Sequence, residues 1–290
     1  MKKKVFLFGL LFSLLLLCGC GVNLTSTVKL NKDFSGTRVM SCTFSSRDFH
    51  SYFKGSKEDL NKLIKESCPD ALTYTSSSSD GNDTYTFYLR FSSLDDYKKK
   101  VRDLLNFSPE ITYEYGDSPF VSGLIYKENF TSKDLMTWLY TALYEGKYID
   151  KDSSSDLWDL KSTEISFLGT TYETKDKINI DEMAYVPLSS IHIDTKTKKS
   201  GKLARVIEFD LPQQTLDQNA GKIRSYFAGN DITWENTSDG KTLCISFDAN
   251  NFSDLAQKTR TVLHSKNSFG TYSSTCSKDN PFTLKINYEE

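Results

Sequence analysis

Hydrophobic and polar residues alternate along much of this chain, at the period of two that is typical of strands with one buried face. The clearest run follows a turn at residues 80–82 and contains the apolar positions Tyr85, Phe87, Leu89 and Phe91. A similar hairpin is predicted around a turn at residues 33–36, with Met40, Cys42 and Phe44 on one face of its second strand. Such strands predict antiparallel sheets that bury one face.

Segments with helical spacing lie between these hairpins. Ser56 with Asp59 resembles a capping box and starts a short amphipathic helix. Ser93 with Asp96 starts a second helix in the same way. The apolar face of the second helix consists of Leu94, Tyr97, Val101, Leu104 and Leu105. A strand over residues 111–115 closes this first group of elements.

The same order of elements returns near the C-terminus. A hairpin turns at residues 200–201, a helix follows Pro212, a second hairpin turns at 239–240, and another helix precedes a final strand. We therefore predict a duplicated β-β-α-β-β-α-β unit in an α+β fold, with an insertion at residues 264–280 of the second copy. The alternative is a chance alternation of hairpins and helices, because few residues are identical between the copies.

The first twenty residues have the plan of a secretory signal. Lysines at positions 2–4 precede an apolar run over residues 5–17, which is shorter than the roughly 20 residues that span a bilayer. Its end, Leu17-Cys18-Gly19-Cys20, resembles the lipobox of bacterial lipoproteins, with Cys18 in place of the usual small residue.

The lipobox resemblance implies cleavage between Gly19 and Cys20 and a diacylglycerol on the Cys20 sulfur, usually with an acylated amino terminus. Two or three acyl chains, at about 0.8 kcal/mol per buried methylene, anchor a protein stably. We therefore expect a lipid-anchored protein on the extracytoplasmic face of a bacterial cell membrane. The alternative is an ordinary signal peptide that leaves Cys20 as a plain thiol.

Four segments describe the expected organisation. They are the signal peptide 1–19, a first α+β unit 20–118, a connecting strand-helix-strand segment 119–188 and a second α+β unit 189–290. The connecting segment holds an apolar helix from Ser132 to Gly146, whose stripe we interpret as core. A serine- and aspartate-rich stretch over residues 151–159 is expected to be a loop.

Two local patterns resemble the LppM-type bacterial lipoproteins. One is the hairpin Val28-x-Leu30-Asn31-x-Asp33-x-Ser35-Gly36-Thr37 directly after the lipobox, and the other is the helix start Phe91-Ser92-Ser93-Leu94. The resemblance covers mainly residues 20–106, with a weaker echo over 189–263. It implies a membrane-anchored α+β domain with a hydrophobic cavity suited to a lipid or glycolipid. The duplication departs from the family pattern.

Composition narrows the possible partners. Removal of residues 1–19 would take away three lysines and no acidic residues, which moves the formal charge from −2 to −5. A mildly acidic chain gives no reason to expect nucleic acid, whose recognition starts from a clustered basic face. The 16 tyrosines and 19 phenylalanines against 6 prolines favour sheet.

Four cysteines remain after the anchor, and they form two well-separated pairs. They are Cys42, Cys68, Cys244 and Cys276. In an exported protein this even number predicts disulfides, which we place between Cys42 and Cys68 and between Cys244 and Cys276. The alternative is four reduced, partly buried thiols. No CxxC occurs, so zinc is not predicted.

No motif predicts catalysis, a cofactor or a metal. His50, His192 and His264 fall in three different elements, each without a neighbouring ligand-type residue. The chain has no GxSxG, HExxH or glycine-rich phosphate loop. A hydrolase whose acidic residues are brought together only by the fold stays open, but no residue favours it.

We therefore expect a non-catalytic, membrane-anchored envelope lipoprotein that binds a lipid or another apolar ligand close to the membrane. The short distance between Cys20 and the first predicted strand supports a position near the membrane. The alternative is a surface module that binds glycan or protein through exposed aromatic residues such as Tyr88 and Tyr140.

Overall fold

The computed structural model describes most of the chain from Val22 onward. The described residues are 22–46, 53–105, 107–150 and 157–264, together with the backbone of 271–276 and 284–289. The predicted cleavage residues Gly19 and Cys20 lie outside this part of the chain.

The described residues divide into two compact units. The first comprises the described parts of Met1–Tyr115 and Leu124–Met183, and the second comprises Gly116–Gly123 and the described parts of Ala184–Glu290. These bounds differ from the predicted ones, because most of the expected connecting segment 119–188 belongs to the first unit. Each unit combines helices with mainly antiparallel sheets, in agreement with the α+β prediction.

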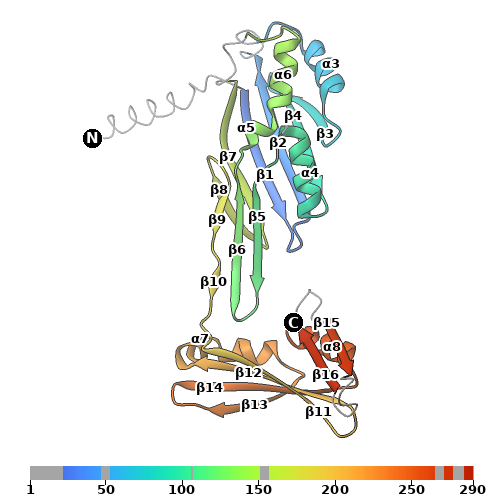
Figure 1. The fold of residues 1–290 in the computed structure, drawn as a ribbon. Coiled ribbons are helices and arrows are strands. Elements are labelled where there is room, and N and C mark those ends of the chain that lie inside the picture. The colour runs from blue at the N-terminus through green and yellow to red at the C-terminus, as the bar shows by residue number, and fades with distance from the viewer. Residues whose placement is uncertain are drawn as a thin grey trace, which may run out of the picture. The chain divides into compact units, whose positions relative to one another are not determined.

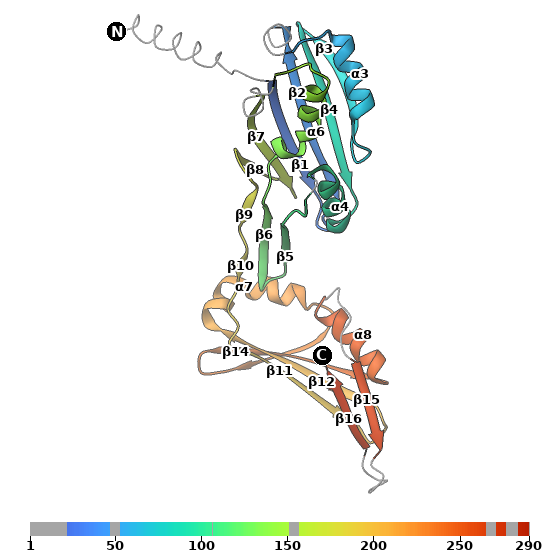
Figure 2. The same cartoon turned by 45° about the horizontal axis from the view of Figure 1, so that its top comes forward.

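A six-stranded sheet forms the framework of the first unit. Its strands are, in spatial order, β3 (Thr73–Ser79), β4 (Asn82–Phe91), β2 (Gly36–Ser45), β1 (Val22–Leu30), β7 (Trp158–Phe167) and β8 (Thr170–Thr174). All neighbours are antiparallel except β1 and β7, which are parallel. The helices of this unit are α3 (Lys57–Ser67), α4 (Leu94–Leu105), α5 (Ser132–Leu135) and α6 (Thr137–Glu145). Figures 1 and 2 show these helices along one face of the sheet.

Local sequence signals account for these elements. The predicted alternation in β4 is confirmed, because Tyr85, Phe87, Leu89 and Phe91 are buried and their neighbours are more exposed. Asp80 and Gly81 turn between β3 and β4 with φ angles of 52° and 76°, a conformation that glycine and aspartate tolerate. The predicted capping box of Ser56 and Asp59 starts α3.

The remaining strands of the middle of the chain form a smaller sheet. They are β5 (Ile111–Asp117), β6 (Val121–Glu128), β9 (Asn179–Asp181) and β10 (Ala184–Tyr185). β6 pairs with β5 and, antiparallel, with β9 and β10. The buried residues Leu124, Tyr126 and Glu128 alternate along β6, so one face of this strand belongs to the core of the first unit.

The apolar segment predicted as one helix from Ser132 to Gly146 is divided in two. α5 ends at Leu135, and α6 begins at Thr137. The residue between them, Met136, has φ −99° and ψ 8°, which lies outside the helical region. The expectation that the apolar stripe belongs to the core is confirmed. Its buried members are Leu135, Met136, Leu139 and Leu143.

A four-stranded antiparallel sheet forms the second unit. Its strands are, in spatial order, β11 (Ser190–Thr197), β12 (Leu203–Pro212), β14 (Gly240–Ala249) and β13 (Asp231–Asn236). Its helices are α7 (Gln213–Tyr226) and α8 (Phe252–Val262), which contact the sheet and bury a core around Ile207, Ile223 and Ile245. Two further strands, β15 (Thr271–Cys276) and β16 (Leu284–Glu289), pair with each other.

Four strands of the first sheet correspond to the second sheet pair by pair. The order β3-β4-β2-β1 matches β13-β14-β12-β11. The β2–β4 ladder has ten residue pairs, from Gly36–Phe91 to Ser45–Asn82. The β12–β14 ladder also has ten, from Leu203–Ala249 to Pro212–Gly240. The β1–β2 and β11–β12 ladders also run in step, ending at Leu30–Gly36 and Thr197–Leu203.

The helix that follows β4 in the first unit starts in the same way as the helix that follows β14 in the second unit. In α4, Asp96 accepts a hydrogen bond from the Ser92 amide, and Lys100 donates to Asp96 and to the carbonyl oxygen of Arg90. In α8, Asp254 accepts from the Asn250 amide. Lys258 then contacts Asp254 at 3.2 Å and donates to the carbonyl oxygen of Asp248 at 2.8 Å.

A buried ion pair joins the elements of the first unit. The guanidinium of Arg38 on β2 donates to the carboxylate of Glu128 on β6 at 2.7 Å, and both side chains are at most 1% exposed. The same Arg38 nitrogen donates to the Tyr97 hydroxyl at 2.7 Å, and the other terminal nitrogen donates to Ser132 at 2.8 Å. Glu128 also accepts from the hydroxyls of Tyr97 and Tyr126.

The contacts within this network keep Arg38 protonated and the hydroxyls of Tyr97 and Tyr126 neutral. Burial by itself would lower the pKa of Arg38, but the charge of Glu128 and the tyrosine hydroxyls hold that pKa above its ordinary value. Burial raises the pKa of both Tyr97 and Tyr126, and the nearby Glu128 carboxylate adds to the increase. The two hydroxyls therefore stay protonated and act as donors to Glu128.

We predict that Glu128→Gln destabilises the protein by about 3–5 kcal/mol, because it leaves the charge of Arg38 buried without its partner. Urea unfolding followed by circular dichroism measures this loss. Asp181→Asn is the matched control, because Asp181 pairs with Lys127 at a surface where the side chains are 56% and 41% exposed. Its expected cost is at most about 1 kcal/mol. Equal effects of the two substitutions would contradict a dominant role for the buried pair.

Candidate functional site

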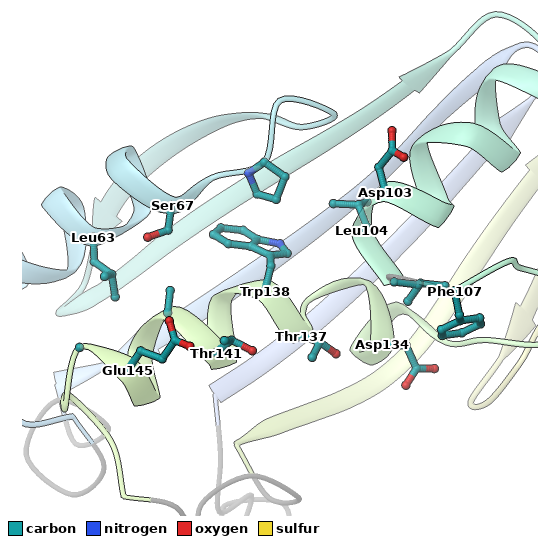
Figure 3. A pocket seen from close by; sticks show the side chains of 14 residues that line it. Leu63, Ser67, Asp103, Leu104, Phe107, Asp134, Thr137, Trp138, Thr141 and Glu145 are labelled. Carbon is teal, nitrogen blue, oxygen red and sulfur yellow. The ribbon is translucent and has the colours of Figure 1, made fainter.

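A cleft between three helices is the candidate functional site of the first unit. It lies among α3, α4 and α6 and has a volume of about 670 Å³. Its apolar lining residues are Leu63, Pro69, Leu104, Leu105, Phe107, Trp138 and Ala142. Figure 3 shows the Trp138 ring between Leu63 and Ser67 of α3 and Leu104 of α4. A cleft of this size and lining accommodates part of a lipid-sized ligand.

Trp138 lines this cleft and carries a buried hydrogen-bond donor. Its indole Nε1 is buried and has no hydrogen-bond partner within the described protein. The ring is held by an edge-on contact with Phe87 of β4, with ring centroids 5.4 Å apart. A buried N–H without a partner costs roughly 1–3 kcal/mol. Because this nitrogen is buried, a ligand oxygen in the cleft would reach it only after the neighbouring side chains move aside.

The charged lining residues of the cleft are all acidic. Asp103, Asp134 and Glu145 line it, and no lysine or arginine does so among the described residues. Asp134 has a structural task as well, because it closes the capping box with Thr131 at the start of α5. This arrangement disfavours a ligand that carries a negative charge inside the cleft.

The cysteines that the structure describes are free thiols. Cys42 is fully buried on β2, Cys68 follows α3, and Cys244 is buried on β14. The predicted Cys42–Cys68 disulfide is therefore not formed in this structure. The side chain of Cys276 lies outside the described residues, so its pairing with Cys244 stays a prediction.

The histidines lie apart. His192 is on β11 with its Nε2 3.9 Å from Asp210, His264 has its Nε2 2.8 Å from the carbonyl oxygen of Tyr226, and His50 lies outside the described residues. Within the described ranges, no three histidine, cysteine or acidic residues lie close enough to hold a metal ion. None of the helices described in the structure is long and apolar enough to cross a membrane.

The two tyrosines proposed for an aromatic surface are half-buried. Tyr88 carries the Arg90 guanidinium over its ring at 5.2 Å, and Tyr140 stacks on Tyr144 with centroids 6.4 Å apart. They lie on different elements, β4 and α6. Trp138 of α6 contacts Phe87, and Tyr88 faces the opposite side of β4, so the structure does not bring these two tyrosines together as a pair.

The sequence reasoning missed the cleft because its residues come from three helices. Phe107 and Trp138 were not singled out, although Phe107 is 47% exposed just after α4. A tryptophan beside a continuous apolar stripe on the same helix was the one available signal.

No family model matches the chain, and no curated protein matches it by sequence.

We predict that the described thiols react slowly in the native protein. Burial, followed by the charge of Asp70, raises the pKa of Cys68 to about 11, and burial raises the pKa of Cys42 further. Because alkylation needs the thiolate, iodoacetamide at about pH 8 should modify Cys68 roughly a hundredfold more slowly than a free cysteine. Cys42 should be modified only after unfolding. If both thiols resist alkylation in denaturant until a reductant is added, they form a disulfide instead.

Proposed function

We propose that this protein is a membrane-anchored, non-catalytic lipoprotein of the bacterial envelope that binds a lipid or another apolar ligand in the cleft between α3, α4 and α6. The observation that carries the proposal is the unpartnered indole N–H of Trp138, buried in the wall of a cleft that combines apolar with acidic side chains. An apolar chain would cover the apolar part of the cleft wall, and a carbonyl, ether or hydroxyl oxygen would accept from the indole once the side chains that cover it move aside.

The length of the tether supports delivery of such a ligand from the membrane. β1 begins at Val22, so Gly21 alone separates this strand from Cys20, the residue proposed to carry the acyl chains. In Figures 1 and 2, the start of β1 and the C-terminal end of α6 lie at the same end of the first unit. Glu145 and Gly146 line the cleft at that end of α6.

The acidic lining supports a ligand with an uncharged head group. Carboxylates of Asp103, Asp134 and Glu145 accept hydrogen bonds from sugar or glycerol hydroxyls and repel phosphate. A diacylglycerol or a neutral glycolipid fits this chemistry better than an anionic phospholipid.

We further propose that the two units descend from one duplicated β-β-α-β-β-α-β unit of the LppM type. The matching strand order and the step-for-step ladders support this origin. The shared Asp–Lys arrangement at the start of α4 and α8 adds a side-chain feature that two unrelated units have no reason to share.

We predict that Trp138→Phe weakens binding of a fluorescent diacylglycerol about two- to tenfold. The phenyl ring keeps most of the apolar wall and removes only the N–H donor, which is worth about 0.5–1.5 kcal/mol. Fluorescence titration of the full chain in detergent measures the dissociation constant, and native mass spectrometry identifies lipids that co-purify. Trp234→Phe is the matched control, because Trp234 is on β13 of the second unit beneath Arg224.

Equal affinities of the wild type and both tryptophan variants would place the ligand elsewhere. Absence of both co-purified lipid and measurable diacylglycerol binding would refute the lipid-binding proposal itself.

We predict that Cys20→Ala abolishes incorporation of radiolabelled palmitate and moves the protein from the membrane fraction to the soluble fraction of the cell. The reason is the loss of the thioether-linked acyl chains, whose burial holds the protein at the bilayer. Cys18→Ala is the matched control and should leave labelling unchanged, because alanine is an ordinary residue at that lipobox position. Continued membrane binding of Cys20→Ala would refute the anchor.

A further inference from the structure

The outer strand of the second sheet leaves two large apolar side chains in solvent. β11 is the first strand in the order β11-β12-β14-β13, so it pairs with β12 on one side and with no described strand on the other. Ile191 and Ile193 are 51% and 45% exposed on this strand. An edge strand with exposed apolar residues is a template for pairing with another strand.

The first unit shows how the corresponding edge is covered. β1 matches β11 in register, and its residues Leu24 and Ser26 are the counterparts of Ile191 and Ile193. Both are at most 3% exposed, because β7 pairs with β1 and the α5 residue Ser132 bonds to Ser26 at 2.8 Å. The second unit has no described strand or helix in the place of β7 and α5.

The described C-terminal strands do not fill this place. β15 and β16 pair with each other from Thr271–Glu289 to Cys276–Leu284, in a sheet separate from the four-stranded one. Among the described residues, then, no strand pairs with the outer edge of β11.

We propose that β11 pairs with β11 of a second copy of this chain. The two strands would run antiparallel about a two-fold axis, so that the two four-stranded sheets form one continuous sheet with their helices on the same side. Such a closed, isologous pair removes both exposed edges at once. This inference does not depend on the ligand proposed for the cleft.

The sequence of β11 is self-complementary in one register. With Ile193 opposite its own counterpart, His192 lies opposite Asp194 on one face, twice by symmetry, and Ile191 lies opposite Thr195 on the other. In this register the His192 imidazole can hydrogen-bond to the Asp194 carboxylate, which also binds Lys196 at 2.7 Å, whereas like charges directly opposite each other are destabilising. A register centred on Asp194 would oppose two carboxylates. Lys196 then lies at the end of the pairing and limits its length.

Thiol crosslinking tests the contact and its register. Ile193→Cys places two thiols directly opposite each other, at the Cβ separation of about 5 Å that adjacent strands allow. Mild oxidation of the full chain in detergent should therefore give a disulfide-linked dimer, above the background that the native cysteines produce in the wild type. Asp194→Cys should crosslink far less, because its counterpart lies two residues along the strand, beyond the reach of a disulfide. Equal crosslinking at both positions indicates random collision and overturns the proposal.

Light scattering tests whether the contact drives association. The full chain in detergent should have the protein mass of a dimer, and Ile193→Lys should raise the dissociation constant at least about tenfold, because it opposes two cations across the strands. Leu168→Lys, at a 55% exposed position of the first unit, is the control that should leave the dimer unchanged. Circular dichroism verifies folding, and Ile193→Thr replaces Ile193→Lys if the lysine variant unfolds. A wild-type chain that stays monomeric at millimolar concentration overturns the proposal, as does a dimer that both Ile193 substitutions leave intact.

Discussion

The ion pair between Arg38 and Glu128 is the constraint on which the first unit depends. Removing two opposite charges from water costs several kcal/mol for each ion, and their attraction offsets this cost only when the remaining hydrogen bonds are made as well. The structure meets most of this requirement with Tyr97 from α4, Tyr126 from β6 and Ser132 from α5, whereas the Nε of Arg38 is buried without a hydrogen-bond partner among the described residues. The members of this network come from four elements, β2, β6, α4 and α5, so the pair ties these strands and helices together.

The position of the candidate cleft follows from this placement. Ser132 bonds to Arg38 on one side and to Ser26 on the other, which fixes α5 over β1 and β2. The chain then breaks at Met136 and starts α6 in a new direction, along α3 and α4. Trp138, in the first turn of α6, thereby enters the space between those helices with its N–H unpartnered. A continuous helix over the same residues would present a different face to α3 and α4.

The second unit has a buried arginine at the corresponding position. Arg205 occupies on β12 the place that Arg38 occupies on β2, and it donates to Thr195 of β11 and Thr259 of α8. Among the described residues, no counterpart of α5 and β7 covers β11. The corresponding sheet is thus left with an open edge, whereas in the first unit that edge lies in the core.

The sequence by itself determined the local elements, because their signals are local. Period-two alternation defined the strands of the hairpins, and Asp80 with Gly81 marked the turn between β3 and β4. Ser56 with Asp59 marked the start of α3. The resemblance to a lipobox around Cys20 and the repeated order of elements were likewise inferred from the sequence alone. Tertiary structure decided which distant segments meet. The parallel insertion of β7 beside β1, the partners of Arg38 and the cleft around Trp138 all join residues far apart in the chain. Periodicity within one segment records which face is buried, but carries no information about the segment that buries it.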